Sequence, residues 1–401
     1  MKRTILLLVS IVGAQAQVRS DPAWVAAWTA GPQQQVGTLK PIQNQTLRMY
    51  VPVAVGASKV RVRFSNEYGN KPLLIGAATI GLLGADGAIE SSSLHKLTFA
   101  NATTVQIPVG APAYSDSIDL RAPASGSLAI SIFLPRETMP ETYHRPVANQ
   151  DNPGPLRPAA ELVGPGDLTR ELKVAGGAPS PYLFLTEVDV RSARVHGVVA
   201  VMGTTRTAGP GHWPDLLTAR LRSAGRNVAV VNASMVANPL TRPYPGGGEA
   251  GLARFDRDVL RLPGISHVVI ADAINDIGQP GGNVVAAAEM PNLETLSAAY
   301  LQLAARAHQR GVKVLVATLM PFEGVPFAGF YSPEKEKLRV ALNEWIRGSK
   351  AFDGLIDLDA LMRDPKQPSK FIDGLHTANN FGPNDAGERK IADAIDLKLF
   401  R

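Results

Sequence analysis

The chain has 401 residues, enough for two ordinary domains, and its composition of 45% hydrophobic and 19% charged residues is that of a globular protein. It contains no cysteine, which excludes disulfides and thiolate metal sites. The formal net charge of +6 comes from basic residues interspersed with acidic ones, a pattern that indicates solubility and argues against nucleic-acid binding.

The amino terminus has the pattern of a secretory signal peptide. Lys2 and Arg3 precede an apolar run at residues 5–12, and Ala14-Gln15-Ala16 supplies small residues for a cleavage site. The run is too short to span a bilayer, and no second long apolar stretch follows it. We therefore predict a signal peptide at residues 1–16, cleavage after Ala16, and a secreted or periplasmic protein with no membrane span.

Residues 24–190 have the texture of a β domain. Residues 59–64 alternate polar and apolar side chains, and turn-forming residues separate this stretch from other short β-branched runs. Further strands are predicted at residues 73–80, 104–107, 128–134 and 182–190. Many short strands without a helical period predict an antiparallel, sandwich-like domain. Residues 146–181 are rich in Pro and Gly and are predicted to form a long loop or cover. Trp24 and Trp28 fit either the core of this domain or a sugar-stacking face, and the core is favoured.

Residues 195–401 change to alternating strands and helices. Apolar strands are predicted at residues 198–202, 228–231, 268–271, 314–318 and 355–358. Helices are predicted at residues 213–223, 252–260, 293–309, 334–347 and 385–397. This alternation predicts a parallel sheet with helices on both faces.

Polar residues follow several of these strands. Gly203-Thr204-Thr205 follows the first, residues 232–238 the second, and Asp272-Ala273-Ile274-Asn275 the third. Asp373-Gly374-Leu375-His376 and Asn379 lie near the carboxyl terminus. In a parallel sheet the carboxyl ends of the strands share one edge, so we expect these loops to converge on one cleft.

This series of motifs resembles the SGNH/GDSL hydrolases, esterases with a flavodoxin-like sheet. The amino-terminal half resembles the β domain of one subgroup over residues 44–48 and 61–69. The carboxyl-terminal half matches at residues 212–217 and 253–260, at Ile274-Asn275-Asp276-Ile277-Gly278 and at Pro383-Asn384-Asp385-Ala386-Gly387. The resemblance implies ester hydrolysis without a cofactor, on an acylated carbohydrate or a lipid. The sequence has no His-Glu-x-x-His or paired metal-ligand spacing, so no metal centre is expected.

The chain departs from the family at the catalytic positions. Thr204 and Thr205 hold the Asp and Ser places of the Gly-Asp-Ser block, whose glycine is Gly203. Ala237 holds the place of the oxyanion-binding glycine, beside Asn238, whereas the oxyanion-donating asparagine is kept as Asn275.

Two alignments compete for the final Asp-x-x-His block. An ungapped alignment puts Asn379 and Gly382 at the acid and histidine places. A gapped one restores both residues as Asp373 and His376. The ungapped alignment is favoured because its spacing between residues 363–365 and Pro383 resembles that of the family.

Two functional hypotheses follow. A hydroxyl nucleophile needs an adjacent base, so a glycine at the histidine place predicts a pseudoenzyme that binds a glycan or ester ligand through Gly203, Thr204, Ala237, Asn238 and Asn379. The alternative is an active esterase in which Thr205 is the nucleophile, His376 the base, Asp373 the orienting acid and Asn275 the oxyanion donor.

Overall fold

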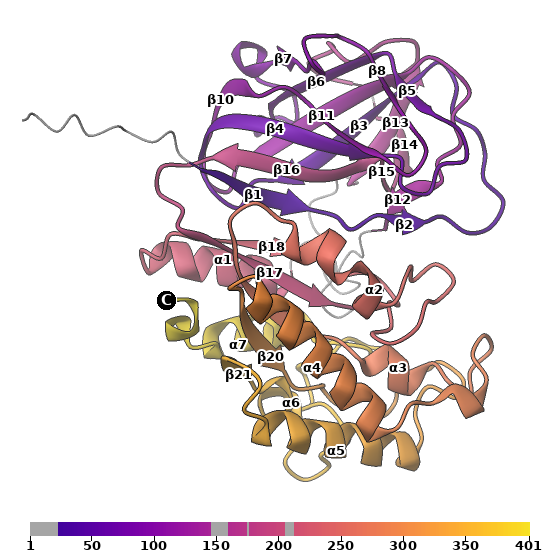
Figure 1. Cartoon of the computed structure of the whole chain (residues 1–401), viewed down its shortest axis with the longest axis vertical. Helices are drawn as coiled ribbons and strands as arrows, with labels where there is room; N and C mark the ends of the chain where they lie inside the picture. The colour runs from indigo at the N-terminus through magenta and orange to yellow at the C-terminus, as the bar shows by residue number, and fades with distance from the viewer. Residues whose placement is uncertain (1–22, 146–158, 175, 205–211) are drawn as a thin grey trace, which may run out of the picture.

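The computed structural model describes residues 23–145, 159–174, 176–204 and 212–401 (Figure 1). Three predictions fall wholly or partly outside this part of the chain. They are the expected signal peptide at residues 1–16, the first part of the loop expected at residues 146–181, and the candidate nucleophile Thr205.

The carboxyl-terminal half is built on a five-stranded sheet in which every pair of neighbours is parallel. Its strands are β17 (Gly197–Gly203), β18 (Val228–Asn232), β19 (Ile265–Ala271), β20 (Lys313–Ala317) and β21 (Gly354–Ile356). The spatial order is β18-β17-β19-β20-β21, which is the 2-1-3-4-5 order of flavodoxin-like folds. In such a sheet the strand order reverses between the first and third strands, here β17 and β19, and ligands bind at the carboxyl ends of these strands. The predicted parallel sheet is confirmed.

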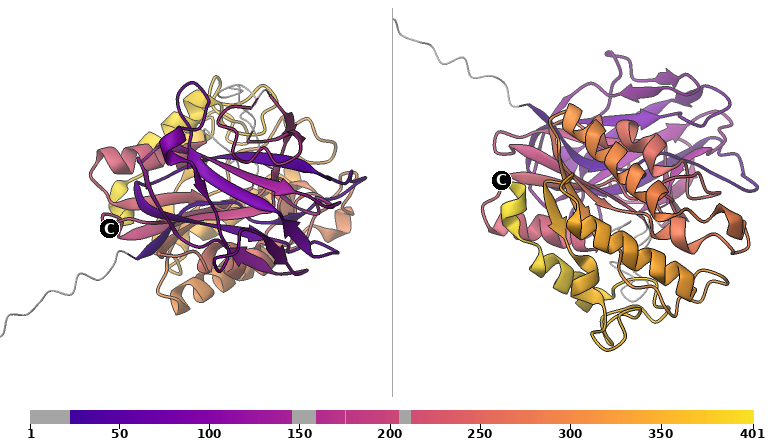
Figure 2. Two further views of the ribbon diagram at one scale, coloured as in Figure 1. Left: turned by 90° about the horizontal axis from the view of Figure 1, so that it is seen from above. Right: turned by 60° about the horizontal axis from the view of Figure 1, so that its bottom comes forward.

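Helices cover both faces of this sheet. They are α1 (Trp213–Ser223), α2 (Gly251–Phe255), α3 (Ile274–Gly278), α4 (Leu293–Gln309), α5 (Pro333–Gly348), α6 (Leu358–Met362) and α7 (Asp385–Ala394). Val199 and Val201 of β17 belong to the buried cluster that includes residues of α1 and α7, whereas Val198 and Ala200 belong to the cluster that includes residues of α4 and α5. Alternate side chains of a strand point to opposite faces, so the near-continuous apolar run of β17 follows from its central place. Figure 2 shows α4 and α5, in orange, lying side by side on one face of the parallel sheet.

Two helix predictions need correction at their ends. The stretch predicted as a helix at residues 252–260 is the short α2 followed by a π-helical turn, η2 (Asp256–Leu260). The last helix ends at Ala394 rather than near residue 397, and η4 (Leu397–Phe400) is a separate 3₁₀ turn. Asn384, whose side chain accepts hydrogen bonds from the N–H groups of Ala386 and Gly387, caps α7.

The amino-terminal half is antiparallel and rich in β structure, as predicted. One sheet has the order β1-β16-β4-β10, with β9 also paired to β4, and the other has the order β14-β13-β3-β11-β6-β7. The first contains β1 (Trp24–Thr29), β16 (Leu185–Arg191), β4 (Ala57–Ser65), β10 (Ile118–Ala122) and β9 (Pro112–Tyr114). The second contains β14 (Ala178–Ser180), β13 (Ala160–Pro165), β3 (Gln45–Pro52), β11 (Ser127–Leu134), β6 (Ala77–Leu82) and β7 (His95–Lys96).

Smaller elements complete this half. They are the three-stranded sheet of β15 (Tyr182–Leu183), β12 (Thr142–His144) and β2 (Gln33–Gln34), the pair β5 (Leu73–Ile75) and β8 (Val105–Ile107), and the turn η1 (Ser91–Ser93). The expectation of a long loop over residues 146–181 is wrong where β13 and β14 form, because β13 pairs with β3 from Ala160 to Pro165.

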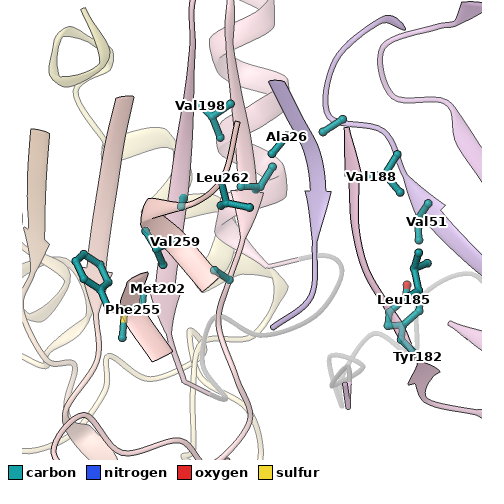
Figure 3. Packing of buried hydrophobic residues seen from close by; sticks show 14 of the residues in the cluster. Ala26, Val51, Tyr182, Leu185, Val188, Val198, Met202, Phe255, Val259 and Leu262 are labelled. Carbon is teal, nitrogen blue, oxygen red and sulfur yellow. The ribbon is translucent and has the colours of Figure 1, made fainter. Parts of the chain in front are cut away.

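The two halves share one buried core. The N–H of Ala26 in β1 donates to the carbonyl of Pro263 at 2.9 Å, and Val25 and Ala26 belong to the same apolar cluster as Val198 and Leu262. Figure 3 shows Ala26 lying beside Val198 and Leu262. The amino-terminal strands are therefore fixed against the side of the parallel sheet. Within the described residues no helix is long and apolar enough to cross a membrane.

Candidate functional site

The site lies where β17, β18 and β19 end. Gly203 is the last residue of β17, and Thr204, which follows it, is almost fully buried. The α3 turn begins just after β19 and carries Asn275 and Asp276, both buried. The structure therefore brings Gly203, Thr204 and Asn275 together, as the strand order requires.

Both hydrogens of the Asn275 amide are already engaged. Its Nδ2 donates to the hydroxyl of Thr204 and, at 3.0 Å, to the backbone carbonyl of Asn238. A carboxamide has only two N–H donors. In this arrangement Asn275 links three loops and has no third hydrogen to offer to an oxyanion.

Two alanines at this rim have left-handed backbones. Ala237 has φ +57° and Ala273 has φ +83°. Glycine adopts this conformation without a Cβ clash, whereas other residues pay a steric cost. The carbonyl of Ala237 accepts from Nε2 of Gln279 at 2.9 Å. The Ala237 backbone thus has the turn that suits a glycine, in agreement with its place in the alignment.

Asn238 is committed to the scaffold. Its Nδ2 donates to the carbonyls of Gly247 and Glu249 at 2.8 and 2.6 Å, and its Oδ1 accepts from Nε of the fully buried Arg254 at 2.8 Å. These bonds hold the 232–250 loop in place, and the side chain has no exposed surface for a ligand.

A cavity of about 1080 Å³ opens beside these loops. It lies between the two halves of the chain, and its walls include Ala237 and Asn275 on one side and Gln35, Tyr143 and Arg145 on the other. Its apolar lining residues include Val36, Val284, Pro326, Phe327, Phe330 and Phe381. Among the described residues that line it, none is His, Asp, Glu or Lys.

Asp373 and His376 lie elsewhere. They share a cavity of about 470 Å³ with Glu323, Lys370 and Phe371, and no described residue lines both this cavity and the large one. Nδ1 of His376 lies 2.9 Å from the carbonyl of Thr377, and its ring packs on Phe371 with centroids 6.0 Å apart. In this arrangement the Asp373–His376 pair is not brought to the cavity that contains Asn275.

The ungapped alignment points to a different part of the same loop. Oδ1 of Asn379 accepts from the hydroxyl of Thr377 at 2.7 Å and from the N–H of Phe381 at 3.1 Å. Gly382 is buried and accepts from the N–H of Thr377 at 2.9 Å. Asn379 therefore shapes the loop. Of this segment, Phe381, which lies between Asn379 and Gly382 in the sequence, lines the large cavity.

Asp272, which the sequence places at this edge without a role, is a buried acid beneath the rim. Asp272 follows β19, and burial raises the pKa of its carboxyl to about 7 against the opposing charge of Arg254. Its Oδ1 accepts from the N–H of Ala273 at 2.7 Å. Its Oδ2 is buried without a hydrogen-bond partner in the described residues. The only available signal was its position directly after an apolar strand.

The sequence reasoning missed a buried pair that joins two helices. His212 precedes α1, and its Nδ1 lies 2.8 Å from Oε1 of Glu388 in α7. The other oxygen of Glu388 accepts from the N–H of Trp213 at 2.7 Å. Burial opposes the charge on His212, but the Glu388 carboxylate outweighs it and raises the pKa of the imidazole. His212 lines neither of the two cavities described above.

Comparison with known families shows to which family this half of the chain belongs. Residues 198–390 match the model of the GDSL-like lipase/acylhydrolase family. This part of the chain belongs to the SGNH/GDSL hydrolase family. The predicted recognition is thereby confirmed, and the matched region begins in β17 and ends in α7.

Solved structures similar to this GDSL domain include three bacterial proteins. One is a protein assigned to the G-D-S-L lipolytic family from Desulfitobacterium hafniense DCB-2, with 18% identity over 49% of this chain and 95% of that one, at a TM-score of 0.37. A GDSL-like lipase from Bacteroides thetaiotaomicron VPI-5482 has 15% identity over 51% and 88%, at 0.37. The esterase EstA from Pseudoalteromonas sp. has 13% identity over 49% and 93%, at 0.35. Identities and TM-scores this low establish neither an activity nor a substrate for this chain. A comparison with curated protein sequences gave no significant match.

Proposed function

We propose that the protein is an exported GDSL-type homologue that binds an ester or acylated glycan in the large cavity and hydrolyses it poorly or not at all. In this proposal residues 24–190 form a sandwich-like domain that closes one side of the cavity, and residues 195–401 form the hydrolase-like domain. The observation that carries the proposal is the lining of the cavity, whose described residues include no carboxylate and no imidazole.

The chemistry of ester cleavage supports this proposal. An alcohol attacks an ester only when a base removes its proton, and the base must lie within hydrogen-bond reach. His376 instead lines another cavity, and His212 is paired to Glu388. The Asn275 amide, which would stabilise the oxyanion, already donates both hydrogens. Each of these features supports the loss of one component of acyl transfer.

The same cavity is suited to binding. Three phenylalanines form one wall, and Phe327 and Phe381 meet edge to face with centroids 5.3 Å apart. Backbone and amide groups of Ala237, Gln279 and Asn283 lie among the other lining residues. An apolar wall opposite a few polar groups is the usual composition of a small-molecule site. It fits the acyl chain of an ester, with the polar part toward Asn275.

The second candidate is an active esterase that uses Thr205 with His376, Asp373 and Asn275. Asn275 lines the large cavity, and Asp373 and His376 line one common cavity, which is the observation in its favour. For this mechanism His376 would have to leave the carbonyl of Thr377 and enter the large cavity.

Hydrolysis of p-nitrophenyl acetate and butyrate by the mature protein tests both candidates. We expect turnover about 10⁴-fold below that of an intact serine triad, and no further loss in Thr205→Ala or His376→Ala. The combined variant Thr204→Asp, Thr205→Ser, Asn379→Asp and Gly382→His should gain turnover, because it restores four of the five family residues that this chain lacks. Robust wild-type turnover that both single substitutions abolish would establish the active esterase instead.

Binding is measured with p-nitrophenyl butyrate itself, since the proposal predicts that the ester is consumed slowly or not at all. Phe327→Ala should weaken binding about tenfold, the loss expected for one aromatic contact. Val340→Ala on α5 is the matched control, because Val340 is 38% exposed and does not line the cavity. Equal binding by both variants would contradict the assignment of the cavity.

A further inference from the structure

A second cavity, of about 250 Å³, lies between the two halves of the chain. Strand β1 and the β12–β15 pair provide one side, and α1 with the end of β18 provides the other. None of its described lining residues also lines the large cavity. It is a separate site, and the proposed function does not depend on it.

The β12–β15 pair is the wall between the two cavities. Tyr143 and His144 are neighbours in β12, and Tyr143 lines the large cavity whereas His144 lines the small one. Alternate side chains of a strand point to opposite sides, which explains this division.

Two aromatic rings form one wall of the small cavity. Trp28 and Tyr182 meet at an angle of 66° with centroids 4.9 Å apart. The hydroxyl of Tyr182 donates to the carbonyl of Tyr50 at 2.8 Å, which fixes that ring. Trp28 is only partly buried, so it is both part of the core and a surface of the cavity.

His144 presents a hydrogen-bond acceptor to the same cavity. The carbonyl of Gly31 lies 3.0 Å from its Nδ1 and can only accept, so Nδ1 carries the proton and Nε2 has the free lone pair. The ring is 7% exposed, and this is its one hydrogen bond within the described residues. Burial lowers the pKa of His144 to about 4, so the ring is neutral at physiological pH.

The remaining polar groups are a carboxylate, an amide and hydroxyls. Asp215, Asn232 and Thr218 line the cavity, and Asp215 is the charged residue among the described lining. No described lining residue is Lys or Arg, so the cavity offers no cation to a phosphate, sulfate or carboxylate. Acceptors beside aromatic faces suit a neutral ligand with several hydroxyl groups.

We propose that this cavity binds one ring of a neutral sugar. Its volume lies just below the range of about 300–1,000 Å³ typical of drug-sized ligands, which limits the occupant to a small molecule. The apolar face of the ring would pack on Trp28 and Tyr182, and its hydroxyls would donate to Nε2 of His144 and to the Asp215 carboxylate.

Calorimetric titration of the mature chain with methyl β-D-glucopyranoside, methyl β-D-xylopyranoside and N-acetylglucosamine tests this proposal. We expect at least one of them to bind with a millimolar or tighter Kd. Thr218→Trp places a large side chain in the cavity and should weaken binding at least tenfold. Ala219→Trp, one residue along α1 on an exposed position outside the cavity, should leave it unchanged.

Two further measurements guard against a folding artefact. Trp28→Leu keeps an apolar side chain but removes the aromatic face, and it should also weaken binding at least tenfold. The ¹⁵N resonance of Nε2 of His144 should shift when the sugar binds.

Absence of binding by all three sugars, or equal binding by Thr218→Trp and wild type, would overturn the proposal. So would binding of tetramethylammonium in place of sugars. Binding of p-nitrophenyl butyrate in the large cavity should be unaffected by Thr218→Trp, so the two proposals fail independently.

Discussion

At the scale of single residues, Asp272 gives the stability of the fold a dependence on pH. Asp272 is fully buried at the end of β19, with Arg254 and Asp276 as its charged neighbours, and burial raises the pKa of its carboxyl to about 7. An unfolded Asp titrates near 3.9. Between these two values the folded state holds a proton that the unfolded state has released. The free energy of unfolding therefore falls as the pH rises from about 4 to about 7.

Asp272→Asn should remove this contribution to the pH dependence. Between pH 5 and pH 8 the wild type should lose roughly 2 kcal/mol more of its free energy of unfolding than the variant does. Urea denaturation at the two pH values measures the difference. Asp119→Asn is the control, because Asp119 is 82% exposed in its ion pair with Lys59. Parallel pH profiles for wild type and Asp272→Asn would contradict the assigned pKa.

At the scale of elements, a buried clasp joins α1 to α7. Glu388 accepts from the N–H of Trp213 and pairs with His212, and all three residues are buried. The two helices lie on the same face of the sheet, and residues of both pack against Val199 and Val201 of β17. The clasp thus fixes the start of α1 relative to the last helix of the domain.

Glu388→Ala should destabilise the fold by about 3 kcal/mol, because it leaves a buried imidazole and a buried N–H without their acceptor. Glu388→Gln keeps one acceptor and should cost less. Arg389→Ala, the exposed neighbour on α7, should change the free energy of unfolding by no more than about 0.5 kcal/mol. Equal denaturation midpoints for Glu388→Ala and Arg389→Ala would refute a stabilising role for the clasp.

The elements were more predictable from sequence than their ends. The helix predicted at residues 293–309 is confirmed as α4, because its apolar side chains recur at spacings of three and four. Strand β13 was missed because Gly164 and Pro165 indicate a loop, although backbone pairing with β3 overrides that preference. The periodicity of apolar residues predicts that a strand exists. The strands with which it pairs depend on residues that are distant in the sequence.

The candidate site was likewise predictable from the sequence only in part. Strand order implies that Ala237 and Asn275 meet at one edge, and both line the large cavity. Motif spacing could not show that Asn275 donates both amide hydrogens to neighbouring loops, or that His376 turns to the carbonyl of Thr377. Such details depend on side-chain direction within loops, where no periodic pattern constrains them.

At the scale of the whole molecule, the two halves are joined by a continuous core and by ion pairs. Arg261 pairs with the buried Glu187 at 2.7 Å, and Arg257 lies 3.4 Å from Glu67, each bond linking the η2 region to the amino-terminal half. A Cβ on Gly264, which has φ +75°, would lie 2.8 Å from a methyl of Val25. A side chain at position 264 would therefore disturb the junction between the two halves.

We expect the mature protein to unfold in one transition, although chains with two domains often show more than one. Hydrogen exchange measured by mass spectrometry, at increasing urea concentration, should give the same opening free energy for peptides of β3 and β11 as for peptides of β19 and β20. Gly264→Ala should lower both values together, because the added methyl disturbs the junction. Loss of protection in one half at lower urea would show that the halves unfold separately.

The close fit of Val25 against Gly264 also limits how such a protein can be rebuilt or diversified. Grafting the amino-terminal half onto another hydrolase would leave Val25 facing a foreign surface, and the matching glycine turn and arginines would have to be transferred with it. The residues that join the two halves must therefore change on both sides at once.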